Sequence, residues 1–120
     1  PFFSAYVYQD EMNSEQVTLH IGQGGIGLPD RDYYFNNDAR TKNIREEYKK
    51  HIVNMFKLMG QDSTTATTNM NKVWNLELSF AKASRKLEDL RDPYANYNKK
   101  AVSELNKLTP SINWSTLFSE

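Results

Sequence analysis

The sequence predicts a mainly α-helical fold with one antiparallel β-hairpin, forming an incomplete domain. Near the start of the chain, two segments alternate apolar and polar residues with a period of two, which is typical of paired strands. Further along, two segments repeat apolar residues every three or four positions, which is typical of amphipathic helices. With 120 residues, of which 12% are aromatic, the chain is one domain or part of one, and its core rests on large rings.

Residues 2–9 and 17–23 are the two predicted strands, and together they form a hairpin over about 2–23. Each strand places apolar side chains on one face and more polar ones on the other. The polar residues 10–16 separate the strands. Because this connection is long for a hairpin, we expect a bulge or an irregular tip.

A segment rich in glycine, with one proline, spans residues 22–35 and interrupts the second strand before the first helix begins. That helix is predicted over about 38–59, with Asn37 or Asp38 as its N-cap and Gly60 as its expected end. Its apolar residues follow the helical spacing: Ile44, Tyr48, Ile52, Met55, Phe56 and Met59.

A second helix is predicted over about 63–86, and a shorter one over about 99–108 that ends at Thr109-Pro110. Pro93 argues for a break between them, because the residue before a proline avoids the helical conformation. Apolar residues from 112 to 118 begin a further segment. These helices expose too little apolar area to be stable singly, so they must pack on one another.

The composition excludes several classes of function. Lys+Arg and Asp+Glu both number 15, so no net charge draws the chain to nucleic acid. The absence of cysteine rules out disulfides, thiol catalysis and cysteine-ligated zinc. No apolar run approaches the roughly 20 residues of a membrane span. The chain opens on a strand-like segment without a signal peptide or initiator methionine, so we interpret it as a fragment of a longer protein.

Two histidines and a group of glycines are weak candidates for a metal or phosphate site. His20 and His51 fall on different predicted elements, and neither begins an H-E-x-x-H motif, so we expect each on an outer face. The glycines within 22–27 follow a strand, but no helix opens directly after them, which disfavours a phosphate-binding loop. The sequence therefore offers no catalytic residue and no metal ligand.

Glu77 projects from the apolar face of the second helix, since its neighbours three and four positions away are all apolar. A buried carboxylate needs a partner, and Arg31 and Arg91 lie in irregular segments that can cross this helix. We expect a structural polar cluster of Arg31, Asp32, Glu77 and Arg91. The alternative is a general acid or base with a raised pKa, which we disfavour because no second catalytic group is visible nearby.

A series of specific motifs runs through nearly the whole chain, from about Phe2 to Trp114. The most distinctive is Gly27-Leu28-Pro29-Asp30-Arg31-Asp32-Tyr33-Tyr34-Phe35. The others are Asp10 with Asn13-Ser14, Leu76-Glu77 with Ala81, Arg91-Asp92-Pro93, Tyr97-Asn98-Lys99, and Leu105 and Leu108 with Trp114. In this order and spacing they resemble the N-terminal peptidase domain of neprilysin and endothelin-converting-enzyme relatives.

The resemblance implies a parent protein that is a zinc endopeptidase acting on peptides, with a thermolysin-like catalytic lobe and a helical lobe around a cavity. The zinc ligands of the family come from H-E-x-x-H and a later glutamate, and its general base is the glutamate of that motif. None of these has a counterpart here, so we expect a fragment without a cofactor that helps to wall the substrate cavity, while zinc is bound elsewhere in the parent.

The expected partners are the remainder of the parent chain and the peptide substrates of the parent, and not nucleic acid. A dimer of the isolated fragment is possible through exposed apolar remnants. Animal members of the family rely on disulfides, so the lack of cysteine favours a bacterial relative outside the cytoplasm, whether periplasmic, surface-anchored or secreted.

The rival interpretation is a non-enzymatic helical module that binds a peptide or protein through the tyrosine-rich face of the hairpin. Tyr6 and Tyr8 share one strand face with His20 nearby, which suits such a contact. A downstream H-E-x-x-H motif would favour the peptidase.

Overall fold

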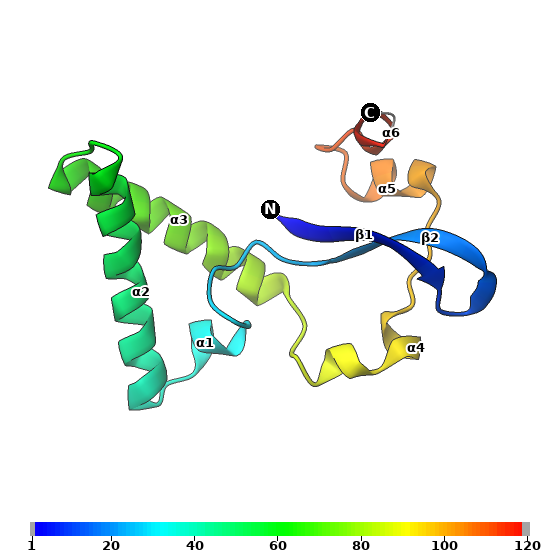
Figure 1. The fold of residues 1–120 in the computed structure, drawn as a ribbon, viewed down its shortest axis with the longest axis horizontal. Coiled ribbons are helices and arrows are strands. Elements are labelled where there is room, and N and C mark those ends of the chain that lie inside the picture. The colour runs from blue at the N-terminus through cyan, green and yellow to red at the C-terminus, as the bar shows by residue number, and fades with distance from the viewer. Residues whose placement is uncertain (1, 119–120) are drawn as a thin grey trace.

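The computed structural model describes residues 2–118 and confirms a mainly helical chain with one antiparallel hairpin (Figure 1). The elements are β1 (Phe3–Asp10), β2 (Asn13–Gln23), α1 (Asp32–Phe35), α2 (Ala39–Leu58), α3 (Ser63–Ala83), the 3₁₀ turn η1 (Asp89–Arg91), α4 (Pro93–Asn96), α5 (Val102–Leu108) and α6 (Trp114–Leu117).

The two strands pair in register from Phe3 opposite Gln23 to Gln9 opposite Val17, and the pairing becomes irregular next to Asp10. The irregular tip agrees with expectation, but the connection is shorter than residues 10–16, because β2 already begins at Asn13. The Asp10 carboxylate accepts the backbone N–H groups of Met12 (2.9 Å) and Asn13 (3.1 Å). These two bonds close a tight turn that the polar composition did not reveal.

The long helices α2 and α3 form an antiparallel pair, which we call the helical arm. Each begins at an aspartate whose side chain accepts backbone N–H groups of the first turn, Asp38 for α2 and Asp62 for α3. Helix α3 ends at Ala83, three residues before the predicted 86, because Ser84 has an extended backbone (ψ 145°).

The short helices differ most from expectation. α1 lies inside the segment 22–35, for which no helix was predicted. Pro93 starts α4 instead of only breaking the chain, since its missing N–H costs nothing in a first helical turn and Asp92 caps the helix. α5 begins at Val102, after the predicted 99, where the Glu104 side chain accepts the backbone N–H of Ala101 (2.8 Å).

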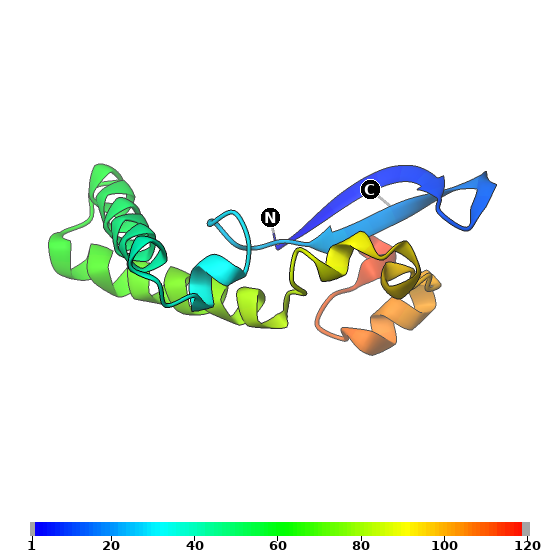
Figure 2. The ribbon, with the colours of Figure 1, turned by 90° about the horizontal axis from the view of Figure 1, so that it is seen from below.

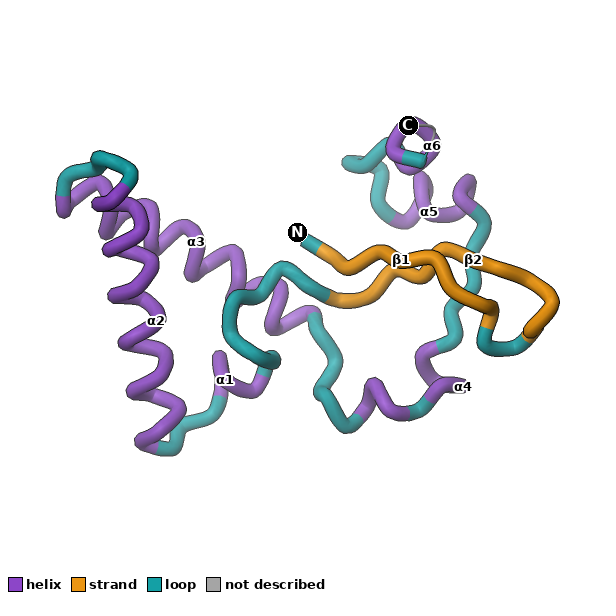
Figure 3. Tube along the Cα trace, viewed as in Figure 1, coloured by secondary structure: helices purple, strands orange, loops and turns teal. Residues whose placement is uncertain are grey.

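The elements gather in two groups, the arm with α1 and the hairpin with α4, α5 and α6 (Figure 3). In the second group the short helices lie on one side of the hairpin (Figure 2). The Cα radius of gyration is 17.9 Å, whereas about 14 Å is expected for a compact domain of this length. A small core of Leu28, Tyr34 and Ala81 lies where α1 meets the arm. This elongated shape suits a part of a larger body.

No helix in the described part of the chain combines the length and the apolar character that crossing a membrane requires.

Candidate functional site

The first polar cluster is built around Glu77, which extends from α3 toward α1 and α2. Its two carboxylate oxygens accept the hydroxyl groups of Tyr34 (2.7 Å) and Tyr48 (2.9 Å). The Tyr34 hydroxyl oxygen in turn accepts the backbone N–H groups of Gly27 (3.1 Å) and Leu28 (3.2 Å). This cluster therefore joins both arm helices, α1 and the glycine-rich segment through one carboxylate.

The electrostatics of this cluster keep both tyrosines in their neutral, donating form. Burial, reinforced by the hydrogen bond to Glu77, raises the pKa of Tyr34 to about 12. The same two causes raise the pKa of Tyr48 well above its usual value. Both hydroxyls thus remain donors throughout the physiological pH range. Each carboxylate oxygen of Glu77 therefore accepts a hydroxyl from a different element of the fold.

Gly27 is required for the close approach of its segment to the arm. A Cβ atom at this position would lie 1.8 Å from the Tyr48 hydroxyl oxygen and 3.2 Å from a Glu77 carboxylate oxygen. Gly27 does not have a positive φ, so the requirement is one of space. Gly25 is different, because its φ is +77° and the Phe80 ring also leaves no room for a side chain.

The predicted cluster of Arg31, Asp32, Glu77 and Arg91 is only partly brought together. Arg31 forms an ion pair with Asp32 (3.3 Å) and donates to the Ala81 carbonyl oxygen (3.3 Å). Neither Arg31 nor Arg91 forms an ion pair with Glu77 among the described residues, and Glu77 accepts the hydroxyls of two tyrosines instead. Arg91 instead lines a small polar cleft of about 230 Å³ that also contains Asp32.

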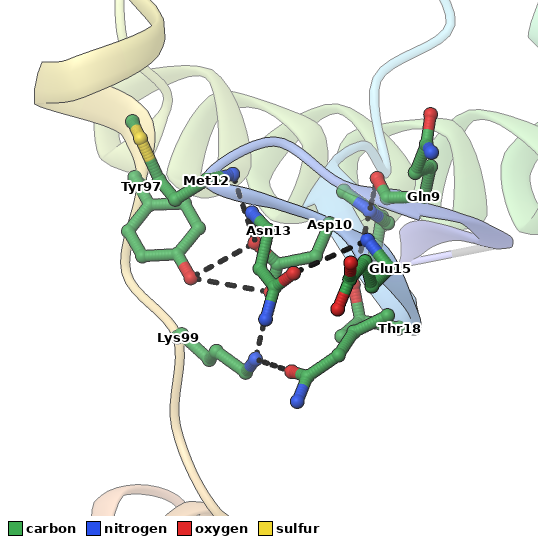
Figure 4. A network of polar contacts seen from close by, with 10 residues as sticks. Gln9, Asp10, Met12, Asn13, Glu15, Thr18, Tyr97 and Lys99 are labelled. Atoms are coloured by element: carbon green, nitrogen blue, oxygen red, sulfur yellow. Dashed lines mark hydrogen bonds and ion pairs between the residues drawn. The ribbon is translucent and has the colours of Figure 1, made fainter.

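The second polar cluster fastens the hairpin tip to the chain between α4 and α5 (Figure 4). Asp10 is buried, and besides the two turn N–H groups it accepts the Tyr97 hydroxyl (3.1 Å) and the Lys99 ammonium (2.7 Å). Lys99 also donates to the Gln16 side chain (2.9 Å). The hydrogen bond from Lys99, followed by that from the Met12 amide, lowers the pKa of Asp10 to about 2.

Sequence reasoning missed this second cluster. Asp10 and the Tyr97-Asn98-Lys99 stretch were each recognised as parts of motifs, but they are 87 to 89 residues apart. No periodic pattern connects residues at that separation. The only signal in the sequence was that both motifs belong to the same ordered series of family motifs. That order does not indicate that Asp10 and the Tyr97-Asn98-Lys99 stretch are in contact.

The histidines lie on separate elements. His20 stacks on Tyr6 with ring centroids 5.2 Å apart and meets the edge of Tyr8 at 6.3 Å, on the hairpin. His51 is exposed on α2. In the described part of the chain, no group of three or more histidine, cysteine, aspartate or glutamate residues is arranged to hold a metal ion. The residues of the described part of the chain therefore do not fit the zinc that the resemblance implies for the parent.

Comparison with known proteins places this chain among metallopeptidases. The model described as peptidase family M13 matches residues 1–120. Over 115 residues the chain is 36% identical to endothelin-converting enzyme 1 of Cavia porcellus, covering 95% of this chain and 15% of that protein. Over 116 residues it is 32% identical to neprilysin-3 of Drosophila melanogaster, covering 97% of this chain and 15% of that protein.

Two solved structures of the zinc metalloprotease Zmp1 of Mycobacterium tuberculosis share the fold. The open state matches with a TM-score of 0.86 and 28% identity, over 97% of this chain and 18% of that one. The inhibitor complex matches with a TM-score of 0.82 and 30% identity, over 89% of this chain and 16% of that one. The chain spans about 15% of the length of the curated relatives that it matches.

Proposed function

Because this chain belongs to peptidase family M13, we propose that it is a structural part of a zinc metalloendopeptidase that cleaves peptides. The single observation that carries this proposal is the match over the whole chain to a family model, supported by the likeness to Zmp1, which is itself a zinc metalloprotease. The remainder of the parent chain and peptide substrates are the partners that follow from it.

In this proposal the chain is not catalytic. The sequence contains no H-E-x-x-H motif, and its two histidines lie on different elements. Glu77, on the inner face of the arm, accepts a tyrosine hydroxyl at each of its carboxylate oxygens. Zinc and the base that acts with it then belong to other parts of the parent, and this chain contributes shape.

The contribution of shape depends on stiffness. The cluster around Glu77 fixes α1 and the glycine-rich segment on the arm, and the cluster around Asp10 fixes the hairpin tip. Each joins elements far apart in the sequence through charge-assisted hydrogen bonds, which are stronger than neutral ones. A wall held in this way keeps its outline, and therefore limits the size of peptide that the cavity admits.

We further propose that the parent works outside the cytoplasm, as a periplasmic, surface-anchored or secreted bacterial protein. The support is the family resemblance together with the lack of cysteine in this chain.

The test is zinc quantification and a peptide-cleavage assay on the full-length parent and on the 120-residue chain. We expect about one zinc per full-length molecule and cleavage that a chelator abolishes, with neither property in the chain alone. Stoichiometric zinc or cleavage in the chain alone would refute the non-catalytic role. A full-length protein without either property would refute the peptidase.

The tyrosine-rich hairpin face supports a second candidate, a binding module for peptides or proteins. Tyr6 and Tyr8 are exposed and both contact the His20 ring, and aromatic residues of this kind are enriched at interfaces. Binding of a labelled peptide by the full-length parent that is unaffected by chelation, abolished by Tyr6→Ala, and never followed by cleavage would favour this candidate over the peptidase.

A further inference from the structure

An apolar groove runs along the helical arm between α2 and α3. Its volume is about 300 Å³, and it is lined by Tyr48, His51, Ile52, Met55, Phe56, Met59 and Val73. Neither a carboxylate nor a lysine or arginine side chain lines it. The floor of the groove is the packed interface of the two helices, since Ile52 is only 8% exposed.

The walls of the groove are open. Met55, in the apolar stripe of α2, is 47% exposed, and Met59, the C-cap residue of the same helix, is 74% exposed. A helix that carries apolar side chains beyond the area covered by its partner normally packs on a second partner. The arm extends away from the hairpin and the short helices (Figure 1), and within the described chain the groove is lined only by residues of α2, its C-cap and α3.

The chemistry of the groove narrows what can occupy it. A peptide ligand needs a few well-placed polar groups to fix its backbone. The lining offers only two polar side chains, and the hydroxyl of one of them, Tyr48, already donates to Glu77, which leaves the His51 imidazole. A second copy of the chain would need to bury roughly 1,200 Å² or more for a stable dimer, which a groove lined by a few side chains does not supply.

The remaining occupant is the parent chain itself. The present chain covers 15% of endothelin-converting enzyme 1 and 18% of Zmp1, so most of such a protein lies outside it. The radius of gyration of 17.9 Å, against about 14 Å for a compact domain, indicates an arm built to pack against something larger. We propose that the groove binds an uncharged, apolar segment of the parent peptidase that lies outside these 120 residues. This inference rests on the proposed function.

Methionine oxidation in the native full-length parent tests the proposal without any substitution. Met12, at the hairpin tip, is 44% exposed and serves as the internal reference for Met55 and Met59. Exposed methionines form the sulfoxide readily, so exposure in this structure alone predicts that Met59 reacts fastest. With the groove covered, we expect Met55 and Met59 to react about tenfold more slowly than Met12 under dilute peroxide.

Three outcomes would overturn the proposal. Oxidation of Met59 at least as fast as that of Met12 would show an open groove. Protection that requires an added peptide substrate would assign the groove to the substrate, and protection that grows with protein concentration would assign it to a second copy. Methionine oxidation is measured without any cleavage step. A full-length parent that lacks peptidase activity but protects Met55 and Met59 would therefore refute the proposed function and still support the groove assignment.

A matched pair of variants gives an independent readout. Met59→Lys places a charge in the groove, whereas Leu58→Lys places the same charge on the neighbouring residue, which is 83% exposed and does not line the groove. We expect Met59→Lys to lower the Tm of the full-length parent by several degrees and Leu58→Lys to leave it nearly unchanged. Met59→Leu, which keeps the site apolar, should leave the Tm close to that of the unsubstituted parent. Equal effects of the two lysine variants would contradict the proposal.

Discussion

Gly27→Ala is the substitution for which the structure makes the sharpest prediction. The new Cβ atom would lie 1.8 Å from the hydroxyl oxygen of Tyr48 and 2.7 Å from its Cζ atom, so the ring must move. Such overpacking costs about 1–3 kcal/mol. Displacing the ring also breaks the Tyr48 hydrogen bond to the Glu77 carboxylate, and a bond to a charged group contributes about 1.5–3 kcal/mol. We therefore expect a loss of about 3–5 kcal/mol in the free energy of unfolding.

The assay is thermal unfolding of the full-length parent, with hydrogen exchange of the backbone amides over residues 24–35 as the local probe. Gly22→Ala is the control, because its new Cβ atom would approach only the Ser4 hydroxyl (2.6 Å), which can rotate away. Tyr48→Phe removes the hydroxyl that clashes, so Gly27→Ala should cost less in that background than in the wild type. The rescue is partial because Cζ remains. Equal losses for the two alanine variants, or strictly additive losses in the double variant, would refute the reasoning.

Three further predictions test the two polar clusters and the packing of the hairpin base. The pKa of Asp10 falls from 3.8 to about 2 on folding, so the stabilisation from the Asp10 carboxylate is complete above pH 4 and disappears as the pH falls toward 2. Hydrogen exchange of the Met12 and Asn13 amides should therefore accelerate from pH 4 to pH 2. Constant protection over this range would contradict the role of Asp10 in the turn. Glu77→Gln should lower the pKa of Tyr34 from about 12 toward, but not to, its ordinary value, because burial remains while the charge is lost, and an NMR titration of the ring measures it. Trp114→Ala should destabilise by about 3 kcal/mol, because the buried ring packs on Phe3 with centroids 5.5 Å apart, and unfolding at unchanged denaturant midpoint would show that this packing contributes nothing.

The fold class was predictable from the sequence because its main elements are long enough to show a period. Helices α2 and α3 have 20 and 21 residues, which is more than five turns each, and an aspartate stands where the cap of α2 was expected. α1, α4 and α6 have four residues each, which is about one helical turn and too short for a period to appear. The ends of these short helices depend on single residues. Pro93 is an example, because a proline can either end one helix or occupy the first turn of the next.

The candidate site shows where one-dimensional reasoning reaches its limit. The period of α3 correctly turns Glu77 inward, because that follows from helix geometry alone. The choice of partner does not follow, since it depends on which side chains of α1 and α2 approach α3. Arginines were the expected partners of a buried carboxylate, yet two tyrosines supply the hydrogen bonds without adding a second buried charge.

The junction between the arm and the hairpin depends on weaker interactions than either polar cluster. The Gln23 side-chain amide donates to the Arg85 carbonyl oxygen (3.1 Å) and accepts the Arg85 N–H (2.9 Å), and Arg85 donates to the Ala95 carbonyl oxygen (3.2 Å). These bonds are exposed, and a typical net contribution is only about 1 kcal/mol each. The Glu77 and Asp10 clusters each lie within one group, so the arm is joined to the hairpin by these exposed bonds and by the contact of the Phe2 and Phe80 rings, whose centroids are 5.5 Å apart. The apolar groove lies toward the end of the arm that is farther from this junction. A segment of the parent bound there would restrain the angle of the arm at the greatest distance from the junction.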